Sequence, residues 1–475
     1  MKIRENIALF LKFSYNEKWK MRKGEGFVAR FAFLTEVRDC EKYLPQAIES
    51  ILGQTWQDLD YYITDDGSQD GTREIIKAYA AKDPRIIPDF CTGDMHGNFN
   101  KTLKRIYESG AEYFALLDAD DWYEPDFAQT MVELLERTGA DLAEGKFTAH
   151  YEEDGSQEEL VGFGEGLLTL EEFTEDFAWY SFFDSVQQWW CKVYRLSLLR
   201  QLDLFADAGW DTEFVLRYRA GCGKFAVCDR AFHHYRIRQD SDCHKRLQTF
   251  DGRHAAKALA LQHEAREKLL AAGNCRNQES RLMAAYQDVN GVRCNMMRLY
   301  AGDVPEAQAA RELLYLLRLP FLPEAYESIQ TAFEKTGRLF FAQPEQSRQA
   351  ISSIQSYYGR FLRQIWKLEG QGQEKFLFEW LCRVFPNLAL FFELEDLPIL
   401  MVEKAVPILE GRWRGAIAGL RQALPQEPEG LLRAYVCGLI HPRDPFIPRF
   451  LEARQGTLSK KKQKFLDCKR ETGLL

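Results

Sequence analysis

Three of the four aspartates in the stretch YFALLDADDWYEPDF, which runs from Tyr113 to Phe127 of this 475-residue chain, fall within four consecutive residues. Asp118, Asp120 and Asp121 lie close together in sequence, and their carboxylates repel one another unless a cation joins them. A hard divalent cation such as Mg²⁺ or Mn²⁺, bridged to the phosphates of a substrate, meets that need. A solvated acidic loop that caps a helix is the structural alternative, and these residues alone do not separate the two interpretations.

The residues around the acidic loop predict where it lies in the fold. The apolar run before the loop is short and unbroken, as in a strand that is buried on both faces of a parallel sheet. Pro125, which follows the loop, suits the first turn of a helix. The carboxylates would then lie beyond the carboxyl end of a central strand, where open α/β sheets bind their ligands.

Strands and helices alternate along this half of the chain. Apolar runs predict strands over residues 27–34, 59–64 and 85–90, and each is followed by apolar residues at helical spacing. A further strand is expected over 142–151, paired with 159–163 through a turn at Asp154 and Gly155. The predicted fold class is α/β, with a mixed sheet flanked by helices.

The domain organisation follows from where these patterns change. Residues 1–26 suggest a helical appendage rich in aromatic and basic residues, and residues 27–245 form the α/β domain. From residue 246 to 475 only helical periodicity remains, which predicts an all-α domain. The stretch GRWRGAIAGLRQALPQEPEG fits one tetratricopeptide-like unit, without a second copy. This half is interpreted either as a lid or homo-oligomerisation bundle, or as an acceptor platform or partner dock.

Composition excludes several functional classes. A net charge of -9 argues against a general nucleic-acid binder. The 11 cysteines form no CxxC pair, so reduced thiols in the cytoplasm are the simplest account. The apolar run of residues 7–11 is too short to span a bilayer. Basic clusters near residues 18–23 and 460–464 are interpreted as solvated helix faces, or as peripheral contacts with the inner face of the cell membrane.

Residues 27–245 resemble a family 2 glycosyltransferase of the GT-A fold, the Rossmann-like fold of nucleotide-diphospho-sugar transferases. The first block is YLPQAIESILGQTW followed by ITDDGSQDGT, and the second is GNFNKTLKRIYESGAEYFALLDADDWYEPD. The third is WWCKVYRLSLL followed by GWDTEFVLRYRAG and HHYRIRQDS. The order and spacing of the blocks carry the resemblance, since the triplet DAD alone is a weak signal.

The resemblance implies a metal-dependent, inverting glycosyltransferase that uses Mn²⁺ or Mg²⁺. Such an enzyme moves a sugar from a nucleoside diphosphate to a hydroxyl of a glycan or lipid-linked acceptor, here in bacterial surface polysaccharide synthesis. The departing diphosphate gains negative charge, and the acceptor hydroxyl must lose a proton to a positioned carboxylate. Uridine is the default base of the donor, and thymidine and guanosine remain alternatives.

The resemblance also assigns the acidic residues. Asp118 and Asp120 match the family's DXD motif, whose members reach the donor ribose and the metal. Asp65 matches the carboxylate that hydrogen-bonds the base, and Asp66 is a second donor-binding candidate. A role as a turn carboxylate beside Gly67 fits Asp66 better than Asp65.

The third block supplies the expected base and the diphosphate clamp. Asp211 matches the catalytic base, although Trp210 stands where a glutamate is usual, and Glu213 is the second candidate. Arg236 is a natural clamp for the donor, because a guanidinium forks onto phosphate oxygens.

Two pairs of consecutive residues in the third block, two histidines and two tryptophans, each allow alternative roles. His233 or His234 is a candidate third metal ligand, with His234 selected here, and the alternative is a hydrogen-bonded structural histidine. Neighbours on a strand face opposite ways, so Trp189 is expected inward and Trp190 toward the acceptor.

The end of the first strand departs from the family pattern. Glu36, Arg38 and Asp39 stand where relatives carry a proline and a tyrosine followed by an asparagine, in the region that touches the base. Arg38 either pairs with Glu36 or reaches the donor. The altered strand and Trp210 also support a second hypothesis, in which a catalytically degenerate domain is an interaction scaffold for the helical half. A nucleotidyltransferase is disfavoured, since no glycine-rich, lysine-bearing phosphate loop follows the first strand.

Overall fold

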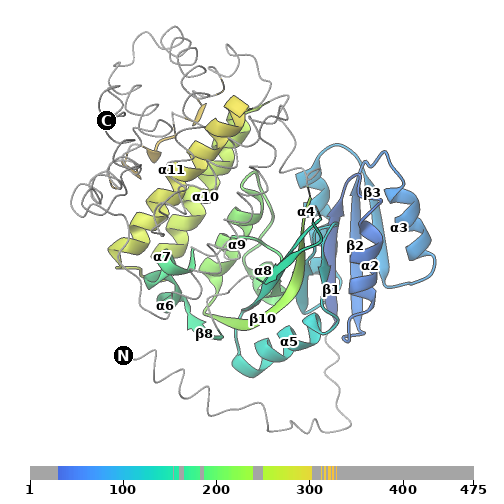
Figure 1. The fold of residues 1–475 in the computed structure, drawn as a ribbon. Coiled ribbons are helices and arrows are strands. Elements are labelled where there is room, and N and C mark those ends of the chain that lie inside the picture. Colours follow the sequence, from blue (N-terminus) through green and yellow to red (C-terminus); the bar gives the residue numbers. More distant parts are fainter. Residues whose placement is uncertain are drawn as a thin grey trace. The chain divides into compact units, whose positions relative to one another are not determined.

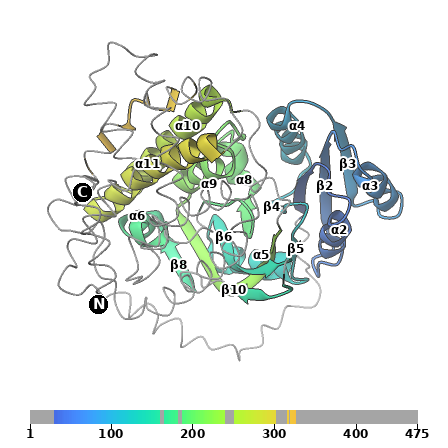
Figure 2. The same cartoon turned by 45° about the horizontal axis from the view of Figure 1, so that its top comes forward.

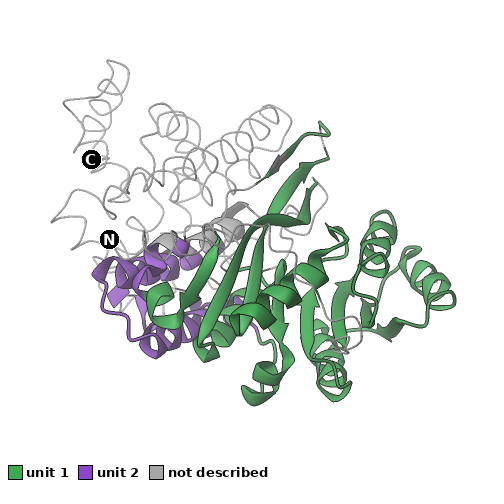
Figure 3. Ribbon diagram, turned by 90° about the horizontal axis from the view of Figure 1, so that it is seen from below, with its two compact units in different colours: residues 1–174, 183–207, 211–238 green, residues 175–182, 208–210, 239–475 purple. Residues whose placement is uncertain are grey.

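The computed structural model describes most of the first half of the chain, namely residues 30–152, 154–159, 165–181, 187–238, 250–301 and short pieces between 312 and 328. The chain divides into two compact units (Figure 3), of which the first comprises residues 1–174, 183–207 and 211–238, and the second residues 175–182, 208–210 and 239–475. The expected appendage at 1–26, all but the first residue of the expected strand at 159–163, and the tetratricopeptide-like stretch lie outside the described residues.

The described strands of the first unit form one ten-stranded mixed sheet, in the order β3-β2-β1-β4-β9-β6-β10-β5, with β7 paired to β6 and β8 to β10. They are β1 (Phe31–Val37), β2 (Leu59–Asp66), β3 (Ile86–Cys91), β4 (Tyr113–Leu116), β5 (Trp122–Tyr123), β6 (Leu142–Tyr151), β7 (Gln157–Glu159), β8 (Gly166–Thr169), β9 (Lys192–Arg195) and β10 (Lys224–Ile237). Pairs β1–β2, β2–β3, β1–β4 and β6–β10 are parallel, and the remaining pairs are antiparallel. The predicted α/β mixed sheet is confirmed.

The helices of this unit connect and flank the strands, as Figures 1 and 2 show for α2, α3 and α4 beside β1–β3 and for α5 beside β5 and β10. They are α2 (Leu44–Leu52), α3 (Thr72–Ala80), α4 (Met95–Glu108), α5 (Phe127–Thr138), α6 (Leu170–Glu175), α8 (Leu196–Gln201) and α9 (Trp210–Gly221). Each predicted helix of the first four βα repeats is present. The α2 helix ends at Gly53, as the sequence indicates.

The core around β1 and β4 is rich in aromatic side chains, and β4 leads into the acidic loop. Phe31 and Phe33 of β1 are fully buried, and their rings stack with centroids 4.3 Å apart. Phe31 pairs with Tyr113 of β4, and Phe127 of α5 covers Phe33. Burial of each such side chain contributes about 1.5–3 kcal/mol, so the strand ends are held on a rigid base.

One short strand was not expected from the sequence. The β5 strand follows the acidic loop directly and pairs antiparallel with β10, with Trp122 opposite His234 and Tyr123 opposite His233. The α5 helix consequently begins at Phe127, after Pro125. A two-residue strand has no periodicity of its own, so only its partner strand, distant in sequence, specifies it.

The topology creates a switch point at the acidic loop. The chain builds β1, β2 and β3 outward and then returns to place β4 on the other side of β1. Such a point, at the carboxyl ends of β1 and β4, is where open α/β sheets bind their ligands. Glu36, Asp66 and Asp118 all lie at or just beyond those ends.

The described part of the second unit is helical, with α7 (Phe177–Tyr180), α10 (Gly252–Ala272) and α11 (Gln278–Ala301). Asp251 caps α10 by accepting from the backbone N–H groups of Arg253 and His254. The α10 and α11 helices are joined by an ion pair between the buried Arg266 and Asp288. Among the described residues, no helix has the length and apolar character needed to cross a membrane.

The end of α5 provides a test of the backbone geometry. Gly139 adopts the left-handed conformation with φ of 63°, and a Cβ atom there would meet nothing within 4 Å. We expect Gly139→Ala to lower the free energy of unfolding by about 1 kcal/mol through backbone strain alone. The matched control is Gly166→Ala in β8, where a Cβ also meets open space but φ lies outside the left-handed region. Equal melting temperatures for the two variants would contradict this account.

Candidate functional site

The site begins where β1, β2 and β4 end side by side. Val37 of β1 lies opposite Asp65 of β2, and Leu34 lies opposite Leu116 of β4. Beyond β4, the Leu117 carbonyl accepts a 2.8 Å hydrogen bond from the hydroxyl of Thr35. This side-chain bond extends the pairing by one residue and fixes the point at which the acidic loop leaves the sheet.

Asp118 opens the acidic loop as a half-buried carboxylate among like charges. Burial raises its pKa well above the usual range, and the charges of Asp121, Asp120 and Asp211 raise it further. A side-chain hydrogen bond from Trp189 acts in the opposite direction. The structure thus brings Asp118, Asp120 and Asp211, three of the predicted site residues, into one electrostatic cluster.

Asp121 is the buried anchor of the loop. It is 1% exposed, accepts from the backbone N–H of Arg236 at 2.7 Å and lies 2.8 Å from Nε2 of His233. Burial raises the pKa of Asp121 and lowers that of His233 to about 3. These bonds tie the loop to β10, so Asp121 and His233 position the neighbouring aspartates.

Two arginines at the end of β10 contact Asp120 in different ways. Arg238 places Nε 2.8 Å from Oδ2 of Asp120, so this pair is an ion pair. Arg236 donates from Nε to the backbone carbonyl of Asp120 at 2.9 Å and from Nη2 to Gln46 at 2.7 Å. Its guanidinium also lies over the Trp122 ring. Two nitrogens of the Arg236 guanidinium therefore hold the loop and α2, and its role as the diphosphate clamp stays a prediction.

Both ring nitrogens of His234 have hydrogen-bond partners. Its Nε2 lies 2.9 Å from Glu124 and its Nδ1 lies 2.8 Å from Nε2 of His150. The ring also stacks on Trp122, with an interplanar angle of 8°. Metal ligation would require one of these hydrogen bonds to break, so the arrangement corrects the selection of His234 and supports its structural alternative.

Both tryptophans of the third block are buried. Trp189 stacks on Phe99, and its side chain hydrogen-bonds Asp118. Trp190 is 5% exposed and stacks on His233 with ring centroids 4.4 Å apart. The expectation that Trp190 faces the acceptor is corrected, because its ring packs between aromatic neighbours. The sequence pattern for a strand also fails here, since β9 begins only at Lys192.

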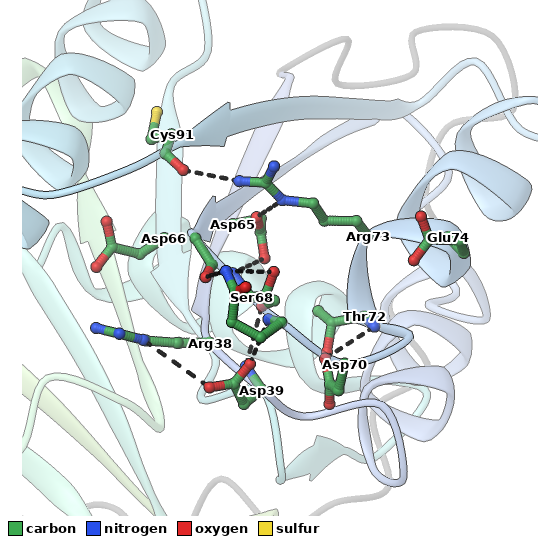
Figure 4. A network of polar contacts seen from close by, with 12 residues as sticks. Arg38, Asp39, Asp65, Asp66, Ser68, Asp70, Thr72, Arg73, Glu74 and Cys91 are labelled. Carbon is green, nitrogen blue, oxygen red and sulfur yellow. Dashed lines mark hydrogen bonds and ion pairs between the residues drawn. The ribbon is translucent and has the colours of Figure 1, made fainter.

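Asp65 and Asp66 are both buried at the end of β2 but face different partners. Asp65 forms an ion pair with Nε of Arg73 at 2.5 Å and accepts from the backbone N–H of Ser68 at 3.3 Å (Figure 4). Asp66 accepts from Asn98 at 2.7 Å. The turn beside Gly67 is thus stabilised by Asp65, which reverses the assignment made from the sequence.

The two charged residues at the end of β1, Arg38 and Glu36, have different surroundings. Arg38 is exposed and lies 4.0 Å from Asp39, not beside Glu36 (Figure 4). Glu36 is half-buried, and its Oε1 has no hydrogen-bond partner among the described residues. Burial raises the pKa of Glu36 to about 8, with further contributions from Asp66 and Asp118. Glu36 therefore faces the carboxylates at the switch point.

Asp211 lies in the first turn of α9 next to a strained residue. Trp210 has φ of 53°, a conformation that is costly for a bulky side chain and that concentrates at functional sites. Burial raises the pKa of Asp211 to about 6, while the backbone N–H of Thr212 and the charge of Lys192 act to lower it. A carboxyl group with this pKa is ionised at pH 7 and is well matched to general base catalysis.

Glu213, the second candidate base, is tied into the protein. It is 1% exposed and pairs with Nη1 of Arg217 at 2.7 Å. The same Arg217 nitrogen also reaches the carbonyl of Phe205. A carboxylate held in this way has a structural partner, which favours Asp211 as the group that meets a substrate.

The carboxylates fit a hard cation in chemistry and number. Among the described residues, no cluster of three or more metal-ligating side chains is present. A third protein ligand is not required, because Mg²⁺ is usually held by one or two carboxylates together with substrate phosphates. Asp118 and Asp120 supply that pair, and their mutual repulsion is the feature that a cation relieves.

An open α/β sheet with carboxylates at its switch point has the arrangement at which α/β domains bind their ligands. Residues 34–202 match the model of the family described as glycosyl transferase family 2. Residues 34–202 therefore form a family 2 glycosyltransferase domain, and the resemblance noted from the sequence is confirmed over this part of the chain.

Individual relatives match over short stretches. The glycosyltransferase GlyA of Streptococcus pneumoniae is 26% identical over 126 residues, which are 26% of this chain and 18% of that protein. The putative glycosyltransferase EpsH of Bacillus subtilis is 30% identical over 127 residues, or 26% of this chain and 35% of that protein. The chain thus matches about a third or less of the length of these relatives. The crystal structure of S. aureus TarS 1-349 in complex with UDP has a TM-score of 0.38 and 14% identity, covering 85% of this chain and 91% of that chain.

Two residues at the site are absent from the sequence-based assignment of roles: Arg238 beside Asp120 and Lys192 near Asp211. The sequence also marks Glu36 and Trp189, but not as neighbours of Asp118. Arg238 had a detectable signal, because residues two apart on a strand share a face and Arg236 was already selected. The other contacts join segments that are distant in sequence and have no local signature.

The buried carboxyl of Glu36 predicts a pH-dependent penalty in the metal-free protein. Its pKa of about 8 in the folded state lies above the ordinary glutamate value of 4.5, so stability falls as pH rises from about 4.5 to 8. We expect Glu36→Gln to raise the melting temperature in the presence of a chelator, by a few degrees at pH 8 and by little near pH 4.5. Thermal melts across this pH range provide the measurement. A gain that is equal at both ends would show that ionisation of Glu36 is not the cause.

Proposed function

We propose that this protein is a metal-dependent, inverting glycosyltransferase that uses a nucleoside diphospho-sugar donor. The observation that carries the proposal is the convergence of Asp118, Asp120 and Asp211 at the switch point of the sheet. The family 2 domain at residues 34–202 supports the same reaction class. An inverting transfer requires an acceptor-side carboxylate that is separate from the donor-side carboxylates, and this constellation supplies both.

Asp118 and Asp120 are the proposed metal ligands on the donor side. A bound Mn²⁺ or Mg²⁺ would supply positive charge for the diphosphate as it departs. Trp189 orients Asp118 through its side-chain hydrogen bond, and Asp121 keeps the loop fixed to β10. The protein thus presents its carboxylate oxygens without rearrangement of the loop backbone, which limits the entropic cost of binding.

Asp211 is the proposed general base. An oxygen of the acceptor hydroxyl forms a bond to the anomeric carbon as the bond from that carbon to the diphosphate oxygen breaks. The proton of the hydroxyl passes to the Asp211 carboxylate in the same step. Displacement of the diphosphate by a nucleophile from the opposite side inverts the anomeric centre, so no covalent intermediate with the protein forms.

The remaining assignments follow from position around this centre. Glu36, Arg38, Asp65 and Asp66 would bind the nucleoside, with a uridine diphospho-sugar as the first donor to test. The proposed acceptor is a glycan or a lipid-linked intermediate of surface polysaccharide synthesis, reached at the cytoplasmic face of the cell membrane. This part of the proposal rests on the family resemblance.

A thermal-shift screen tests the donor and the metal together. We expect one sugar nucleotide to raise the melting temperature in the presence of Mn²⁺ and to have less effect with a chelator, because a ligand of the native state stabilises it. At a free concentration of 100 Kd the gain is about 2.7 kcal/mol. Asp120→Asn should abolish the Mn²⁺-dependent part of the shift.

The control for this experiment is Asp126→Asn, which removes an aspartate from an exposed ion pair with Arg230. It should keep the full shift. If no sugar nucleotide stabilises the native protein with or without Mn²⁺, the proposed function is wrong.

Asp211→Asn tests the base. Asparagine keeps the shape of the side chain but cannot take the proton, so we expect kcat to fall by about 10²–10⁴ with donor affinity nearly unchanged. The wild-type kcat should decline as pH falls below about 6, where Asp211 becomes protonated. Glu213→Gln is the paired variant and should retain transfer. If Glu213→Gln loses transfer and Asp211→Asn keeps it, the two roles are reversed.

A further inference from the structure

Arg238 is the cation that neutralises the exposed part of the acidic loop. Its Nε lies 2.8 Å from Oδ2 of Asp120, and the two side chains are 15% and 22% exposed. It follows the last residue of β10, Ile237, whose carbonyl accepts from Glu152 at 3.0 Å. The backbone that carries Arg238 is therefore fixed by the sheet, and its side chain reaches a proposed metal ligand.

Arg238 differs from its neighbour Arg236 in the acceptors that it contacts. The guanidinium of Arg236 donates to neutral oxygens, the Asp120 carbonyl in the loop and the Gln46 side chain in α2. Arg238 instead contacts a carboxylate oxygen that a metal ion would require. A divalent cation and this guanidinium are therefore alternative partners for the same oxygen.

The Tyr43 ring holds the Arg238 guanidinium close to the acidic loop, whether Asp120 is paired with Arg238 or with a metal ion. The guanidinium carbon lies 5.0 Å from the centre of the Tyr43 ring, within the range of cation–π attraction. Tyr43 is itself fixed, because its hydroxyl donates to Glu152 at 2.8 Å. A guanidinium displaced from Asp120 stays close to the loop, where its planar fork suits phosphate oxygens.

We propose that Arg238 is a built-in counter-cation of Asp120 that the divalent metal displaces, and that the displaced guanidinium then binds the diphosphate of the donor. The inference rests on the proposed function, since it requires a metal and a diphosphate at this loop. Arg238 thus replaces Arg236 as the donor-binding arginine. Arg238 also couples the two binding events, so that each strengthens the other. The metal frees the guanidinium for the diphosphate, and the diphosphate keeps the guanidinium away from the Asp120 carboxylate.

Titration of the full-length protein with Mn²⁺, followed by the electron paramagnetic resonance signal of the free ion, tests the competition. Without nucleotide, we expect Arg238→Met to bind Mn²⁺ about fivefold more tightly than the wild type, because the competing cation is gone. Arg238→Lys keeps the charge and should stay close to the wild type. Arg230→Met removes a charge from the same strand at an exposed ion pair with Asp126 and is the matched control.

Titration with uridine diphosphate at saturating Mn²⁺ tests the second half of the inference. Arg238→Met should weaken nucleotide binding by tenfold or more, and Arg238→Lys should weaken it less. The competition is disproved if Mn²⁺ binds Arg238→Met no more tightly than the wild type, or if Arg230→Met shows the same gain. The diphosphate role is disproved if Arg238→Met keeps its nucleotide affinity.

These readouts separate the inference from the proposed function. Normal Mn²⁺ and nucleotide effects in a wild-type protein that transfers no sugar would overturn the proposed function and leave the role of Arg238 supported. Sugar transfer by the wild-type protein, together with unchanged Mn²⁺ and nucleotide affinities in Arg238→Met, would support the proposed function and overturn the role of Arg238. A wild-type protein that binds no Mn²⁺ with or without nucleotide would overturn both.

Discussion

The repulsion among the carboxylates at the switch point is the constraint on which the rest of the site depends. Asp118, Asp120 and Asp121 are close together in the acidic loop, where burial makes the negative charges of Asp118 and Asp121 costly. Each has its own stabilising neighbour: the Trp189 side chain for Asp118, Arg238 for Asp120, and the backbone N–H of Arg236 for Asp121. The fold tolerates the cluster because the segment before β9 and the end of β10, which are remote in sequence, supply these partners.

The first βα repeats could be predicted from the sequence because their signals are local. A buried strand such as β4 is a continuous apolar run, and a helix such as α2 has its apolar period and a terminal glycine. The β5 strand and the late start of α5 could not be predicted. They depend on pairing with β10, whose residues lie more than a hundred positions away.

The same distinction applies to the site. Asp118, Asp120 and Asp211 could be selected because chemistry and family pattern mark them in the sequence. Their partners could not, since choosing between Arg236 and Arg238 requires knowing which guanidinium meets a carboxylate and which meets a carbonyl. Trp190 illustrates the converse: strand alternation predicts an outward ring, but Cys191 has φ of 54° and interrupts the strand pattern there.

The electrostatics of Asp211 involve a second buried cluster of opposite sign. Glu144, Lys192 and Arg219 are each at most 1% exposed, and both cations approach the same carboxylate oxygen. Burial lowers the pKa of Lys192 to about 8, so it is still mostly charged at pH 7. Such clusters seldom add stability over apolar packing, which favours a role beyond stability. Lys192 lowers the pKa of Asp211, whereas burial raises it. The pKa of Asp211, and with it the strength of the proposed base, is therefore set by a balance between desolvation of its carboxylate and the charge of Lys192 in β9.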